Sequence, residues 1–92
     1  MRLEKALARY ILYLSESSDA THRAEDRPVY TSYLADAAVL LALVVNGADK
    51  SKIEQHIKDH ERLWGQTWPR DPVYKKPRES FENIKKLTGY AV

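Results

Sequence analysis

The segment 28–47, PVYTSYLADAAVLLALVVNG, decides the fold. Pro28 suits the first turn of a helix, where its missing N–H leaves no hydrogen bond unmade. Asn46 and Gly47 tolerate the left-handed backbone of a helix C-cap. Between these ends the apolar residues recur at the helical period of three and four, at Tyr30, Tyr33, Leu34, Ala37, Ala38, Leu41, Val44 and Val45. The segment therefore predicts a helix over 28–46.

The same period predicts helices on both sides of this segment. Residues 2–16 have an apolar stripe at Leu3, Leu7, Tyr10, Ile11 and Leu14. The tetrad 51–54, Ser-Lys-Ile-Glu, matches a capping box, so we expect a third helix over 51–64 that ends at Gly65. Its stripe is Ile53, Ile57, His60 and Trp64. A shorter helix over 78–88 turns Phe81, Ile84 and Leu87 inward.

These elements predict an all-α fold, and the 92 residues fit one domain, 1–92. The expected architecture is a small bundle of three long helices and a shorter fourth. Residues 65–77 contain three prolines and are expected to form an irregular arm. We expect Trp68 to anchor this arm by being largely buried against the bundle.

The composition argues against several classes of function. There is no cysteine, hence no disulfide and no thiolate nucleophile. Three glycines cannot build a phosphate-binding loop, and no serine lies in a Gly-x-Ser-x-Gly elbow. We therefore expect neither a cofactor nor an enzyme.

The first residues lead into an amphipathic pattern and not into a secretory signal. The longest apolar run, Ala37 to Val45, has about half of the ~20 residues that a membrane span needs. The expectation is a soluble, cytoplasmic protein without a membrane span.

The helix over 28–46 has a second apolar side, because Val39 and Leu43 lie opposite its main face. One explanation is a central helix that is enclosed by the others. The interpretation we favour is an interface at Val39 and Leu43, most simply a homodimer about a two-fold axis. Asp36 lies on this side too, and we expect it to be partly exposed and to accept a hydrogen bond from a tyrosine or lysine rather than to act as a general base.

Aromatic and basic residues gather in the segment 64–78, which includes Trp64, Trp68 and Tyr74. Stacking platforms beside basic grooves bind single-stranded nucleic acid. Residues 65–92 carry six basic against three acidic residues, however, and this modest excess makes nucleic acid an unlikely partner. Trp68 and Tyr74 are better candidates for contact with a protein.

His56 and His60 are weak candidates for a metal site. Their spacing of four lets two imidazoles reach one ion, and 56–60 echoes a His-x-x-Glu-His zinc pattern with Asp59 in place of Glu. A catalytic zinc site needs a third ligand that the sequence does not identify. Because His60 falls on the apolar stripe, we expect it to be at least half buried and structural.

The leading hypothesis is a small non-catalytic interaction module, an adaptor, regulator or neutralising partner, that self-associates and contacts an unidentified protein through Val39, Leu43, Trp68 and Tyr74. The alternative is a weak nucleic-acid binder that uses the segment 64–78. A metal-dependent enzyme or metal-binding protein that uses His56 and His60 is the third possibility.

Overall fold

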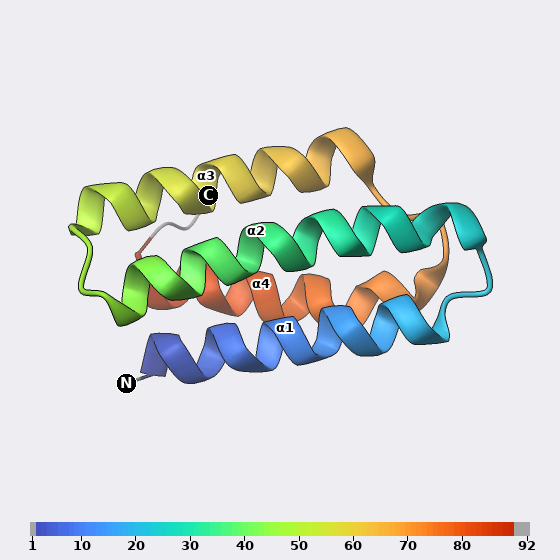
Figure 1. The fold of residues 1–92 in the computed structure, drawn as a ribbon, viewed down its shortest axis with the longest axis horizontal. Helices are drawn as coiled ribbons and strands as arrows, with labels where there is room; N and C mark the ends of the chain where they lie inside the picture. Colours follow the sequence, from blue (N-terminus) through green and yellow to red (C-terminus); the bar gives the residue numbers. More distant parts are fainter. Residues whose placement is uncertain (1, 90–92) are drawn as a thin grey trace.

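The structure is a computed structural model that describes residues 2–89. It contains four helices, α1 (Arg2–Ala20), α2 (Arg27–Val45), α3 (Lys50–Thr67) and α4 (Lys75–Leu87). Short 3-10 turns, η1 (Ala24–Asp26) and η2 (Pro72–Tyr74), precede α2 and α4. Successive helices run in opposite directions (Figure 1), and residues 2–89 contain no strand. The predicted all-α class and the short fourth helix are confirmed.

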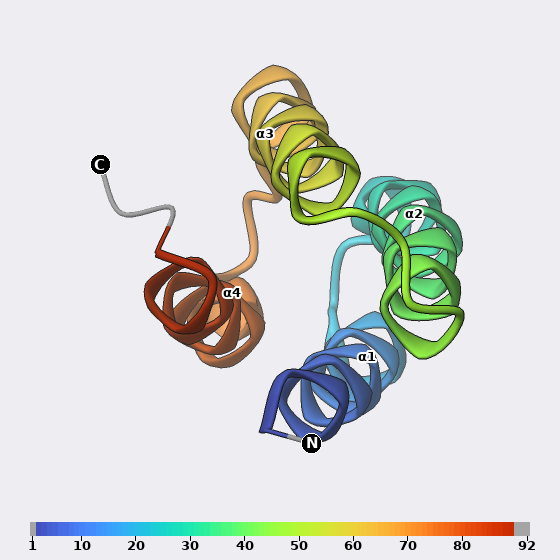
Figure 2. The same ribbon diagram turned by 90° about the vertical axis from the view of Figure 1, so that its left-hand side faces the viewer.

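The helices are not evenly spaced around the bundle. α1 packs against both α2 and α4, and α2 packs against α3. Seen end-on, α3 and α4 lie further apart than the other neighbours (Figure 2). Large side chains from both helices fill this space, among them Trp64 and Phe81, which have no exposed surface.

The core is lined by one face of each helix. From α2 it takes Tyr30, Tyr33, Ala37, Leu40 and Val44. The predicted face of α2 was partly wrong, because Ala38 and Val45 are exposed and Leu40 is buried in their place. α2 is apolar nearly all round, so periodicity alone cannot locate the side that its neighbours cover.

Several predicted helix ends differ from the structure. α1 continues past its predicted end at residue 16 to Ala20. α3 begins at Lys50 with Asp49 as its N-cap, so Ser51 lies inside the helix and the predicted capping box does not form. α3 also continues through Gly65 to Thr67. α4 begins at Lys75 and holds Pro77 in its first turn, where a backbone N–H has no partner within the helix anyway. The irregular segment is therefore shorter than predicted.

The α2 terminus agrees with its prediction. α2 ends at Val45, Asn46 is its C-cap, and Gly47 has a φ of 71°. A left-handed residue at this place is the usual way to end a helix, and glycine adopts it without strain.

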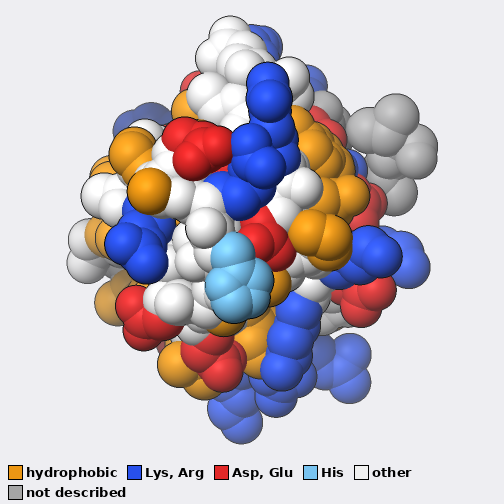
Figure 3. Space-filling model, turned by 90° about the vertical axis from the view of Figure 1, so that its right-hand side faces the viewer, with side chains coloured by type: hydrophobic (Ala, Val, Ile, Leu, Met, Phe, Trp, Pro, Cys, Tyr) orange, Lys and Arg blue, Asp and Glu red, His pale blue; other side chains and the backbone are white. Residues whose placement is uncertain are grey.

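Two buried aspartates join the loops at one end of the bundle. Asp26 accepts hydrogen bonds from the backbone N–H groups of Arg70 and Asp71, the latter at 2.9 Å. Asp71 accepts from the N–H of His22 at 2.9 Å and of Val73 at 3.2 Å. The hydrogen bond from the His22 N–H is the main reason that the pKa of Asp71 is lowered. Acidic, basic and apolar side chains are mixed on the surface of this end of the bundle (Figure 3).

Candidate functional surfaces and the His60 network

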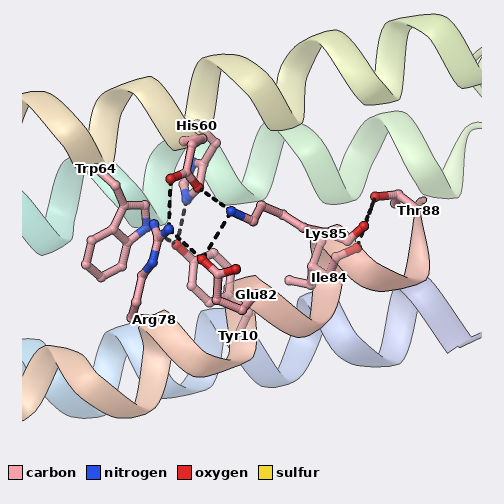
Figure 4. A network of polar contacts seen from close by, with 9 residues as sticks. Tyr10, His60, Trp64, Arg78, Glu82, Ile84, Lys85 and Thr88 are labelled. Carbon is pink, nitrogen blue, oxygen red and sulfur yellow. Dashed lines mark hydrogen bonds and ion pairs between the residues drawn. The ribbon is translucent and has the colours of Figure 1, made fainter. Parts of the chain in front are cut away.

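His60 lies at the centre of the bundle with no exposed surface, which confirms its predicted burial. Its Nε2 atom is 2.6 Å from the Tyr10 hydroxyl, and its Nδ1 atom is 2.5 Å from an Asp36 carboxylate oxygen. Trp64 donates its indole N–H to the same Tyr10 hydroxyl at 2.7 Å. Figure 4 shows how Tyr10, His60 and Trp64 converge from α1 and α3.

The polar side-chain atoms of Trp64, Tyr10 and His60 all have a partner when each residue donates to the next, from Trp64 through Tyr10 and His60 to Asp36. An indole N–H can only donate, so the Tyr10 oxygen accepts from Trp64 and its own O–H donates to Nε2 of His60. The Nδ1–H of His60 then donates to Asp36. The hydrogen bond from His60 lowers the pKa of Asp36, while burial raises that of Tyr10.

Asp36 also faces His56, whose Nε2 atom is 3.1 Å from the second carboxylate oxygen. The predicted tyrosine or lysine partner for Asp36 is thus wrong, because two histidines of α3 take that place. Asp36 is the single acidic residue of the segment 28–47. An isolated carboxylate in an apolar helix was the one sequence feature that could have indicated a buried partner.

This arrangement offers little to a metal ion or a substrate. Both ring nitrogens of His60 already have partners, and within 2–89 no three His, Cys, Asp or Glu side chains are grouped to hold a metal. Asp36, His60 and Tyr10 are hydrogen-bonded in the order carboxylate, imidazole and hydroxyl, which is the arrangement that activates a hydroxyl nucleophile in enzymes. Tyr10 and His60 have no exposed surface, however, so a substrate does not reach them in this conformation. The network joins α1, α2 and α3.

A second polar network crosses the wide side of the bundle. Arg78 of α4 contacts Glu61 of α3 at 2.7 Å and Glu82 at 2.5 Å. Lys85 contacts the same two carboxylates, each at 3.1 Å. Partial burial opposes ionisation of Glu61, but the hydrogen bonds from Arg78 and Lys85 outweigh it and lower its pKa. Figure 4 shows Arg78 and Lys85 pointing from α4 toward α3, with Glu82 beside them on α4.

Trp68 is 45% exposed, so the prediction that it is largely buried is wrong. Because α3 extends to Thr67, Trp68 is the C-cap of the helix and packs edge-on against Trp64 and Tyr74 at centroid distances of 5.2 and 5.3 Å. Pro69 is the fully buried residue that anchors the segment. Tyr74 is partly buried.

The outer side of α2 is apolar and uncovered. Val39 is 51% and Val45 60% exposed, and three alanines lie exposed beside them, Ala35, Ala38 and Ala42. Leu43 is partly buried. The charged residues of α2 are Arg27 at its start and Asp36, which turns toward α3. The structure thus places Val39 on an open surface and Leu43 at its margin.

α2 is more apolar than a helix with so little buried surface needs to be. The segment Ala24–Val45 contains an 18-residue window with a mean hydropathy of 1.7, so it could cross a membrane by length and composition alone, yet only 28% of that window is buried. A core helix would be mostly buried.

No known protein family, curated protein or solved structure matches the chain.

Proposed function

We propose that this protein is a non-catalytic interaction module that self-associates as a homodimer through the outer side of α2, defined by Ala35, Ala38, Val39, Ala42 and Val45. The observation that carries the proposal is an exposed helix surface without a charged side chain, in a protein of which 30% of the residues are charged. Exposed apolar surface of this kind is favourable to bury, and a second copy presents the same surface.

The side chains suit a helix pair. Alanines at 35, 38 and 42 let a second helix approach closely, while Val39 and Val45 protrude from the same surface. A 19-residue helix is about 28 Å long and about 10 Å wide, which gives a footprint on the order of 300 Å² per protomer. Stable complexes bury about 800 Å² per partner, so we expect a weak, reversible dimer.

Sedimentation velocity from low micromolar to submillimolar concentration tests this proposal. The wild-type protein should shift from monomer toward dimer, and Val39→Glu should remain monomeric because it places a carboxylate in the contact. Leu12→Glu is the matched control, because Leu12 is 57% exposed and lies on α1. A wild-type protein that remains monomeric at the highest concentration, or a Leu12→Glu variant that also loses the dimer, would refute the proposal.

A further inference from the structure

Two hollows lie between α1 and α4, and Arg9 borders both. The first, with a volume of about 220 Å³, is lined by Arg2, Lys5, Ala6, Arg9, Asn83 and Leu87. The second, about 290 Å³, is lined by Arg9, Tyr13, Lys76, Glu79, Ser80 and Asn83. Because they share Arg9 and Asn83, they form one groove, called here the α1/α4 groove.

The α1/α4 groove holds positive charges that form no ion pair within the described residues. Within residues 2–89 none of Arg2, Lys5 and Arg9 forms an ion pair or a side-chain hydrogen bond. Lys76 lies 4.5 Å from the centre of the Tyr13 ring, and Glu79 is the one acidic residue among those that line the groove. Arg78 and Lys85 of the same helix α4 are, in contrast, each paired with two glutamates.

The cations form a row along the groove. Positions 2, 5 and 9 lie on successive turns of α1, about 4.5 and 6 Å apart along the helix axis. With Tyr13 the row extends about 16 Å, which suits an extended polyanion rather than a single small anion. Tyr13, Ser80 and Asn83 also line the groove, and each can donate a hydrogen bond to an oxygen anion.

The remaining lining favours nucleic acid over an acidic protein segment. A docked helix needs a row of apolar pockets, and protein interfaces have an apolar centre. Besides Tyr13 the groove offers only Ala6 and Leu87 as apolar lining among the described residues. A surface that binds a phosphate backbone instead presents cations and hydrogen-bond donors and has no apolar centre.

We propose that the α1/α4 groove binds single-stranded nucleic acid through its phosphate backbone, without reading its sequence. The proposal is independent of self-association, because α2 borders α1 on the side away from α4 (Figure 2). A dimer through α2 leaves both grooves open.

Fluorescence anisotropy with a labelled oligothymidylate measures this binding. Lys5→Glu/Arg9→Glu should weaken it by about 10-fold or more, because it reverses two charges that neutralise phosphates. Arg70→Glu/Lys75→Glu is matched in charge change and alters exposed cations of the 64–78 segment. It should retain wild-type binding within about threefold, because neither Arg70 nor Lys75 lines the groove and exposed charges outside it are screened by salt. Lys5→Gln/Arg9→Gln should give an intermediate loss, and circular dichroism melts check that all variants fold.

Salt dependence gives a second measure. Three to four neutralised phosphates predict that wild-type affinity falls about 20- to 50-fold between 50 and 200 mM salt, and that Lys5→Gln/Arg9→Gln has a shallower dependence. Absence of wild-type binding, an equal loss in the Arg70/Lys75 variant, or tighter binding of polyglutamate or of duplex DNA than of the single strand would each overturn the proposal.

Discussion

His60 is held from both sides by partners on other helices, Tyr10 of α1 and Asp36 of α2. Its burial could be predicted, because it falls on the apolar stripe of α3 with Ile57 and Trp64. Its partners could not, since they lie 50 and 24 residues away in the chain and no local pattern joins them. The periodicity of a helix shows which side faces inward and does not show what it meets there.

The Tyr10 hydroxyl is the node of the network, so Tyr10→Phe should be strongly destabilising. Removing the oxygen leaves the Trp64 N–H and the His60 Nε2 atom buried without partners, and each such group costs about 1–3 kcal/mol. Tyr30→Phe is the matched control, because the Tyr30 hydroxyl is buried without a partner among the described residues. It should leave the free energy of unfolding unchanged or raise it. Urea denaturation of both variants measures the difference, and an equal loss in both would contradict this account of the network.

Asp36 makes stability depend on pH in the acidic range. Its pKa in the folded protein is lowered from 3.8, first by the hydrogen bond from His60. A lowered folded pKa means that the carboxylate stabilises the fold above pH ~4 and that this contribution is lost as the pH falls through the folded value. Asp36→Asn should therefore lose stability near neutral pH and show a flatter decline below pH ~4. Urea midpoints from neutral pH downward test it, and parallel curves for the two proteins would count against this role of Asp36.

At the scale of the elements, the existence of all four helices followed from periodicity, but several of their ends did not. A glycine or proline marks a helix end only when the backbone at that place needs its special geometry. Gly47 does, with its φ of 71°. Gly65 lies within α3 and has no positive φ, and the residues on either side of it, Trp64 and Thr67, both contact Tyr33 of α2.

Gly65 and Gly47 should therefore respond oppositely to alanine. A Cβ atom at either position meets no atom within 4 Å, so the backbone decides the outcome. Gly65→Ala should stabilise the protein by about 0.5–1 kcal/mol, because alanine loses less entropy in a helix. Gly47→Ala should destabilise it by about 1–2 kcal/mol, the cost of a left-handed L-residue. Thermal melts compare the two, and a loss of stability in Gly65→Ala would show that α3 does not continue through this position.

At the scale of the whole molecule, the sequence could not reveal which helices are neighbours. α2 looked like a helix enclosed by the others or an interface, and only the packing shows that its outer side is open. The cations of the 64–78 segment looked like one basic cluster. In the fold Arg78 turns inward to Glu61 and Glu82, while Arg2, Lys5 and Arg9 of α1 have no ion pair among the described residues. Basic residues that are close in the sequence can lie far apart in the fold, because a helix turns successive residues to different sides.

The wide space between α3 and α4 is closed by Arg78, and this closure gives the last prediction. The Arg78 guanidinium joins Glu61 to Glu82, lies 5.4 Å from the centres of both the Trp64 and Phe81 rings, and its side chain is 17% exposed. Arg78→Met keeps the apolar stem but removes the charge. Glu61 and Glu82 retain Lys85 and some solvent, so the loss should be about 1–2 kcal/mol and not the larger cost of a stranded buried ion.

Arg62→Met is the control for Arg78→Met, because Arg62 is 65% exposed and pairs with Asp59 on the surface of α3. Exposed pairs contribute about 0–1 kcal/mol, and high salt screens them further. In urea denaturation the loss in Arg78→Met should persist at high salt, since its partners are partly buried, whereas any loss in Arg62→Met should vanish. Equal, salt-sensitive losses in the two variants would mean that aromatic packing, and not the Arg78 ion pairs, holds α4 against α3.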